Sequence, residues 1–106
     1  MKDWTTLGPL SDLENEVGKR YDVGEERLAL FLVGGDVYAI GDLCSHAEAS
    51  LAEGELFDME VECPRHGSSF DVTTGVPKSL PATTPVPVYE VRIVDGVIQA
   101  RSKDSA

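Results

Sequence analysis

The stretch "CSHAEASLAEGELFDMEVECPRHGSS", residues 44–69, holds both cysteines and both histidines of this 106-residue chain. One residue separates Cys44 from His46, two separate Cys63 from His66, and sixteen lie between the two pairs. Cysteine thiolates and neutral imidazoles are common ligands of zinc and iron in proteins. The pattern therefore predicts a metal centre with four ligands that come from two loops.

Other interpretations of the two pairs explain less. A disulfide between the cysteines suits an oxidising compartment and leaves both histidines unexplained. Unrelated buried cysteines would make both pairings a coincidence. Zinc accepts two cysteines and two histidines, but zinc fingers usually take the two cysteines from one loop and the two histidines from another. Here each loop supplies one of each, which favours a binuclear centre of the Rieske type, with cysteines on one iron and histidines on the other. Zinc remains the alternative.

The sequence around the two loops predicts β-structure. Two hairpins are expected where apolar runs flank a two-residue turn: Arg27–Val33 with Asp36–Ile40 around Gly34-Gly35, and Val88–Val94 with Val97–Ser102 around Asp95-Gly96. Shorter strands are predicted at Trp4–Leu7, Tyr21–Val23, Met59–Glu62 and Ser69–Val72. One short turn of helix is expected at Ser11–Gly18, which carries helix-start residues. The prediction is an all-β domain of seven to nine short strands.

Two further predictions concern packing. The segment Pro77–Pro87 contains four prolines, so it cannot continue a sheet and should form a stiff surface loop, suited to act as a lid. The residues expected in the core of the domain are Trp4, Phe31, Leu32, Tyr38, Ile40, Val91 and Ile93.

The charge of the chain restricts its partners. Nineteen acidic against nine basic residues give a formal net charge of −10, so nucleic acid and anionic membranes should be repelled. The same charge suits docking onto a basic patch of another protein, or serves only for solubility. No stretch approaches the roughly 20 apolar residues of a membrane helix, and the first residues do not resemble a secretory signal. A cytoplasmic location is expected.

The run from "CSHAEAS" through "CPRHGSSFDVTTG" to "LPATTPVPVYEV" resembles the Rieske-type [2Fe–2S] ferredoxins, the electron carriers of bacterial ring-hydroxylating dioxygenase systems. The resemblance covers nearly the whole chain. It implies one Rieske domain over residues 1–106, a small antiparallel β-sandwich or barrel with a cluster-binding subdomain inserted at about residues 43–69. It also implies one [2Fe–2S] cluster, with Cys44, His46, Cys63 and His66 as ligands.

The resemblance also suggests which residues surround the cluster. Ser68 matches a hydroxyl donor of high-potential Rieske proteins, whereas Phe70 stands where they carry a tyrosine, and Pro81 belongs to the loop that would cover the third side of the cluster. Those proteins add a disulfide at the positions of Ala49 and Arg65, which this chain cannot form. Fewer hydrogen-bond donors predict a potential near the low end of the Rieske range, roughly −150 mV.

Three functions agree with these features, and all are electron transfer rather than catalysis. The favoured one is a soluble, monomeric one-electron carrier that docks transiently with a flavin-dependent ferredoxin reductase and a terminal oxygenase. The alternatives are the small subunit of an assimilatory nitrite reductase and a carrier for another pathway, such as iron–sulfur assembly. The chain should not itself be an oxygenase, because a mononuclear iron needs two further histidines and a carboxylate, and both histidines are already assigned.

Overall fold

Nine β-strands and two short 3-10 helices make up the computed structural model, which describes residues 3–44, 48–65, 67–80, 82 and 84–103. The strands are β1 (Thr5–Pro9), β2 (Lys19–Val23), β3 (Glu26–Val33), β4 (Asp36–Gly41), β5 (Leu56–Phe57), β6 (Glu60–Glu62), β7 (Ser69–Asp71), β8 (Val88–Val94) and β9 (Val97–Ser102). The 3-10 helices are η1 (Leu10–Asp12) and η2 (Leu51–Glu53). The all-β prediction is confirmed.

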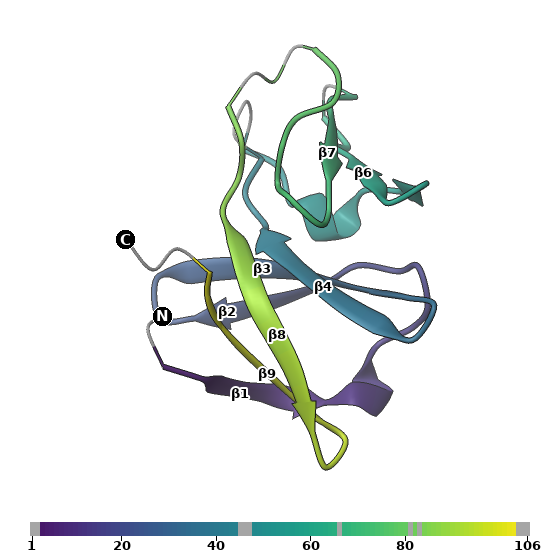
Figure 1. Ribbon diagram of the computed structural model, residues 1–106. Coiled ribbons are helices and arrows are strands. Elements are labelled where there is room, and N and C mark those ends of the chain that lie inside the picture. The colour runs from purple at the N-terminus through teal and green to yellow at the C-terminus, as the bar shows by residue number, and fades with distance from the viewer. Residues whose placement is uncertain (1–2, 45–47, 66, 81, 83, 104–106) are drawn as a thin grey trace.

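Six strands form one antiparallel sheet in the order β1-β9-β8-β4-β3-β2, which curls toward a barrel (Figure 1). Both predicted hairpins are present, with Val33 opposite Asp36 and Val94 opposite Val97. All four turn residues, Gly34-Gly35 and Asp95-Gly96, have positive φ. Such turns match the right-handed twist of the flanking strands, so these dipeptides set the register of both hairpins.

The other three strands form a small sheet in the order β5-β6-β7. It is inserted between β4 and β8, which pair directly, with Ala39 opposite Tyr89. The chain therefore leaves the large sheet after β4, builds the small sheet and the proline-rich loop, and returns at β8 (Figure 1). The subdomain predicted at about residues 43–69 falls within this inserted segment.

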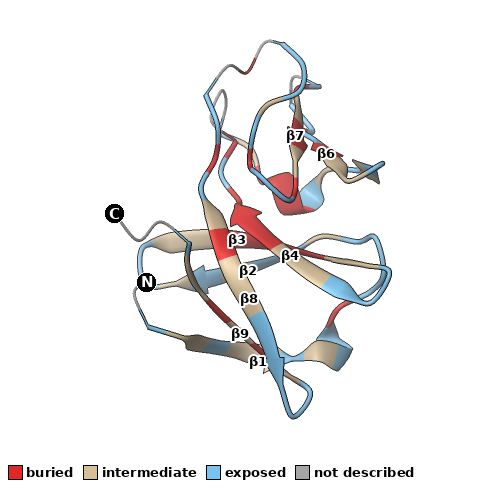
Figure 2. Ribbon diagram, in the orientation of Figure 1, coloured by how far each residue is buried: buried red, intermediate tan, exposed pale blue. Residues whose placement is uncertain are grey.

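Strand β3 is buried on both faces. Leu28 and Leu30 point into a cluster of apolar side chains enclosed by the large sheet, whereas Ala29 and Phe31 point into a second cluster shared with the inserted segment. All four side chains are fully buried. A strand covered on both faces needs a continuous apolar run rather than an alternating one, which explains "LALFLV". Figure 2 shows the buried residues concentrated along β3 and β4 and at η2, where the inserted segment meets the sheet.

The short turn of helix predicted at Ser11–Gly18 is partly correct, since η1 covers its first two residues. Only η1 is helical there, and Asn15 instead forms a parallel bridge with Leu32 of β3. The segment lacks an apolar stripe, so the pairing with β3 prevails over the helix-start residues. A side chain at Gly18 would lie 2.5 Å from the backbone oxygen of Ala52, so this glycine permits close contact with η2.

The predicted core is partly correct. Phe31 and Ile40 are fully buried; Leu32, Tyr38 and Val91 are half-buried and pack against the two clusters. Ile93, near the tip of the β8–β9 hairpin, is 40% exposed and does not belong to the core. Trp4 is half-buried beneath two guanidinium groups, those of Arg92 and Arg101, which lie 4.3 and 4.4 Å from its ring. Cation–π contacts explain how this large ring stays near the surface.

Candidate metal centre

The two predicted cysteine ligands follow strands of different sheets. Cys44 comes three residues after the end of β4 in the large sheet, and Cys63 comes directly after β6 in the small one. Both are in loops, as predicted. His46 and His66, the other two predicted ligands, lie outside the described residues, and so does Pro81.

The fold brings the two cysteines into one buried cluster. The exposed fractions of Cys44 and Cys63 are 4% and 1%, and no disulfide joins them. Their neighbours in this cluster include Leu51 of η2, Phe70 of β7 and Ala82 of the proline-rich loop. Three segments of the inserted region therefore contribute to the buried cluster that holds both cysteines.

The backbone around Cys63 forms a tight turn. The Cys63 N–H donates to the carbonyl oxygen of Ser68 at 2.6 Å, and the Gly67 N–H donates to the carbonyl oxygen of Cys63 at 3.0 Å. Gly67 has a φ of 74°, in the left-handed region that favours glycine. The turn is built on the pairing of Glu62 with Ser69 between β6 and β7, so the second loop is fixed to the small sheet.

The proline-rich loop is attached to the same turn. The Ala82 N–H donates to the hydroxyl oxygen of Ser68 at 3.0 Å, and Ser68 is fully buried. The Ser69 N–H donates to the hydroxyl oxygen of Ser79 at 2.9 Å, and the Lys78 N–H donates to the carbonyl oxygen of Ser69 at 2.7 Å. These bonds attach the described part of the loop to the turn that holds Cys63.

The positions that differ from disulfide-bearing Rieske proteins also lie together. Ala49 and Arg65 line one surface hollow, next to Glu48 and Pro64. The described parts of the two loops therefore lie side by side here, and with no cysteine at either position no disulfide can join them. Phe70 is fully buried in the shared cluster, and it has no hydroxyl group to donate.

The residues that the structure describes fit an iron–sulfur cluster. Two of the four predicted ligands, the thiols of Cys44 and Cys63, lie in one apolar cluster at the start of two loops, and the other two lie outside the described residues. Among the described residues, no group of three metal-ligating side chains occurs. The buried Ser68 hydroxyl lies at the same turn, where its oxygen accepts the Ala82 N–H.

One group at the site was missed by the sequence analysis. Asp42 is fully buried, and its carboxylate accepts hydrogen bonds from Arg27, from the Ser50 hydroxyl and from the Ala52 N–H. The sequence carries one signal, an aspartate two residues before Cys44 at the end of an apolar strand. Its partner Arg27 lies fifteen positions away, and no local pattern connects the two.

Comparisons with known proteins agree with this geometry. The model of the Rieske [2Fe–2S] domain matches residues 3–90. The anthranilate 1,2-dioxygenase ferredoxin subunit of Burkholderia cepacia is 39% identical over 99 residues, which cover 93% of this chain and 92% of that one. The 3-phenylpropionate/cinnamic acid dioxygenase ferredoxin subunit of Escherichia coli K12 is 45% identical over 91 residues, 85% of each chain. The ferredoxin in a solved complex of reduced oxygenase and oxidised ferredoxin of carbazole 1,9a-dioxygenase matches with a TM-score of 0.89 and 36% identity, covering 100% of this chain and 99% of that one.

Fold, loop geometry and comparisons together define an iron–sulfur protein with a Rieske [2Fe–2S] cluster. The chain belongs to the Rieske family and, within it, to the ferredoxin subunits of bacterial ring-hydroxylating dioxygenases. It is an electron carrier and not a catalyst. Within the described ranges, no helix has the length and apolar character needed to cross a bilayer.

Proposed function

We propose that Cys44, His46, Cys63 and His66 hold the cluster, and that the chain carries single electrons from a flavin-dependent reductase to a terminal oxygenase. The observation that supports this ligand set is the burial of both cysteines in one side-chain cluster, although they follow strands of different sheets. The bound cluster supplies one-electron redox chemistry, and histidine ligands on one iron raise its potential above that of an all-cysteine cluster.

The chain's own residues prepare the site for this role. Both thiols belong to the same buried apolar cluster as Leu51, Phe70 and Ala82 and are almost inaccessible to water. A low local dielectric strengthens the effect of every nearby charge and hydrogen bond on the potential. Ser68 provides the one fully buried hydroxyl group at the described part of the site, and it also ties down the proline-rich loop.

Exposed apolar side chains next to the loops support transient docking at this end of the molecule. Leu43, directly before Cys44, is 45% exposed, and Leu80, in the proline-rich loop, is 78% exposed. An apolar centre with a polar rim is typical of the surfaces that proteins use to bind each other. The carbazole 1,9a-dioxygenase relative was solved in complex with its oxygenase, and we propose an oxygenase as the acceptor of this chain too. We further propose that the carrier is a cytoplasmic monomer, since it has to exchange partners.

Single substitutions of the four proposed ligands test the ligand set. Cys44→Ser, Cys63→Ser, His46→Asn and His66→Asn should each abolish the reddish colour, the EPR signal of the reduced cluster, and the stoichiometry of two irons and two labile sulfides per chain expected for this cluster type. The measurement is iron and sulfide analysis of the purified variants, with EPR after reduction.

Arg65→Gln is the matched control, because Arg65 lies between two of the proposed ligands and its side chain is exposed. This variant should keep a full cluster. A colourless protein with one zinc per chain, or a full cluster in Cys63→Ser, would contradict the proposal. Mixing the intact carrier with a reductase and an oxygenase of this class should give electron transfer that depends on its concentration.

A further inference from the structure

The base of the first ligand loop is closed by backbone hydrogen bonds. The Leu51 N–H donates to the carbonyl oxygen of Asp42 at 2.7 Å, and the Cys44 N–H donates to the carbonyl oxygen of Ala49 at 3.0 Å. Residues 42–44 and 49–51 are thus paired at the base of this loop, and we call this paired base the neck. Whatever fixes the neck also fixes the backbone of Cys44.

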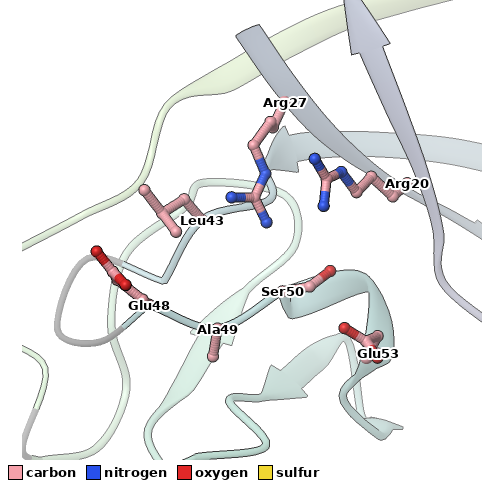
Figure 3. A pocket seen from close by; sticks show the side chains of 7 residues that line it. All are labelled: Arg20, Arg27, Leu43, Glu48, Ala49, Ser50 and Glu53. Atoms are coloured by element: carbon pink, nitrogen blue, oxygen red, sulfur yellow. The ribbon is translucent and has the colours of Figure 1, made fainter.

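The carboxylate of Asp42 fixes the neck to the large sheet. Its Oδ1 accepts from the Ser50 hydroxyl at 2.7 Å and from the Ala52 N–H at 2.9 Å, both on the far side of the neck. Its Oδ2 accepts from Arg27 Nη2 of β3 at 2.9 Å. Figure 3 shows the guanidinium groups of Arg27 and Arg20 reaching into the hollow that Ser50 also lines. Asp42 is fully buried, so its bonds to Ser50 and Ala52 are shielded from competing water, whereas the Arg27 side chain is 32% exposed at the hollow.

The second ligand loop has a different anchor. Cys63 is held by its bond to Ser68 and by the pairing of β6 with β7 in the small sheet. The relative position of the two cysteines therefore depends on how the first loop is attached to β3. The ion pair between Arg27 and Asp42 fixes the direction of that attachment, whereas apolar packing alone would not fix it.

We propose that Arg27 and Asp42 are a positioning pair for the cluster. Their two opposite charges also adjust the midpoint potential of the cluster. This inference rests on the proposed ligand set. Asp42 is two residues from Cys44, a span of at most about 7 Å along the chain. At that range in a buried environment, a carboxylate disfavours the added electron and a guanidinium favours it. The carboxylate thus lowers the midpoint potential and the guanidinium raises it.

Substitutions that keep shape and remove one charge test the pair. Asp42→Asn keeps an acceptor for Ser50 and Ala52 and should raise the midpoint potential. Arg27→Gln should lower the potential, whereas Arg27→Lys keeps the charge and should restore it toward the wild-type value. Asp42→Ala loses the acceptors as well and should lose iron faster on warming. The measurements are redox titration followed by visible circular dichroism, and iron content against time.

Glu90→Gln is the matched control. Glu90 forms an exposed ion pair with Arg101 at 2.7 Å on the β8–β9 hairpin, so its loss removes one negative charge without touching the neck, and the potential should stay that of the wild type. Shifts of the same sign in Asp42→Asn and Arg27→Gln, or shifts no larger than in the control, would overturn the proposal. If Asp42→Asn does not assemble a cluster, the comparison of Arg27→Gln with Arg27→Lys still tests the proposal. Equal midpoint potentials in these two variants would overturn it, and a lower potential in Arg27→Gln would support it. A full cluster in Cys63→Ser would instead refute the ligand set, whatever Asp42 does.

Discussion

At the scale of single residues, the site depends on buried polar atoms that have partners. The hydroxyl oxygen of Ser68 accepts the Ala82 N–H and still has its own proton to donate. Tyr89 is nearly buried among apolar side chains, and its phenol donates to a carboxylate oxygen of Glu26 at 3.0 Å. Groups of this kind stabilise the fold only while their partners remain.

Ser68→Ala should change both stability and potential. The substitution leaves the Ala82 N–H without an acceptor, which costs about 1–3 kcal/mol for a buried group. It also removes a hydroxyl group that we expect to donate to the more negative, reduced cluster, so the midpoint potential should fall. Chemical denaturation and redox titration measure the two effects. Ser69→Ala, at the next position, is the control, and an unchanged potential in Ser68→Ala would exclude the donor role.

Tyr89 should make stability depend on pH in the alkaline range. Burial first, and then the hydrogen bond to Glu26, raise the pKa of Tyr89 well above its ordinary value of 10.0. The folded state therefore holds the phenolic proton more tightly than the unfolded state does. The stabilisation is complete below about pH 10 and is lost as the pH rises toward the folded pKa.

The ¹³Cζ resonance of Tyr89 should still show a neutral phenol at about pH 11, where an unperturbed tyrosine is mostly ionised. The difference in unfolding free energy between the wild type and Tyr89→Phe should shrink as the pH rises above about 10. A resonance that moves at the ordinary pKa would contradict the assignment.

At the scale of elements, close backbone contacts hold the inserted segment together. Gly54, at the end of η2, has no room for a side chain, because an added Cβ would lie 1.9 Å from the carbonyl oxygen of Glu62. This contact places η2, which lies next to the first ligand loop, against β6, which leads into Cys63. The two ligand loops are therefore coupled through backbone as well as through the shared cluster.

Gly54→Ala should destabilise the fold by about 3 kcal/mol, because one of the two backbones has to move. It should also speed the loss of iron, since the movement reaches the residue before Cys63. Thermal unfolding and iron release at constant temperature measure the two effects.

Gly24→Ala is the control for that substitution. Gly24 has a φ of 59° and nothing within 4 Å of an added Cβ, so only the left-handed backbone is strained, at about 1–2 kcal/mol. Iron retention should not change in this variant. Equal iron release in both variants would show that the contact of Gly54 with Glu62 does not support the site.

At the scale of the whole molecule, the net charge of −10 should control how fast partners meet. An acidic carrier is attracted to a basic docking surface, and salt screens that attraction. The second-order rate constant of electron transfer from a reductase should fall by about tenfold or more as salt rises from low to high concentration. Stopped-flow absorbance at several ionic strengths measures this.

Leu80→Ser separates charge from apolar contact in the same experiment. It removes an exposed apolar side chain beside the site and leaves the charge unchanged. The rate constant should fall by a similar factor at every ionic strength, and the midpoint potential should stay that of the wild type. A rate constant independent of salt in the unmodified chain would argue against a basic partner surface.

The sequence predicts the parts of this fold that depend on near neighbours. The dipeptides Gly34-Gly35 and Asp95-Gly96 specify both long hairpins, because turn geometry is a property of the turn residues. The cysteine and histidine spacing predicted the kind of cofactor, because ligand types and loop lengths can be taken directly from the sequence. The prediction was only partly correct at Ser11–Gly18, where a short 3-10 turn is followed by pairing with β3, and it missed β5, which is only two residues long.

What the sequence determined by itself is the chemistry of the centre and the all-β class. Only the tertiary structure decided that Cys44 and Cys63, which follow strands of different sheets, share one buried cluster with Ala82 of the proline-rich loop. Only the tertiary structure paired Arg27 with Asp42. The physical reason is that a buried contact between distant residues depends on which surfaces the folded chain brings together, and no local sequence pattern determines such a contact.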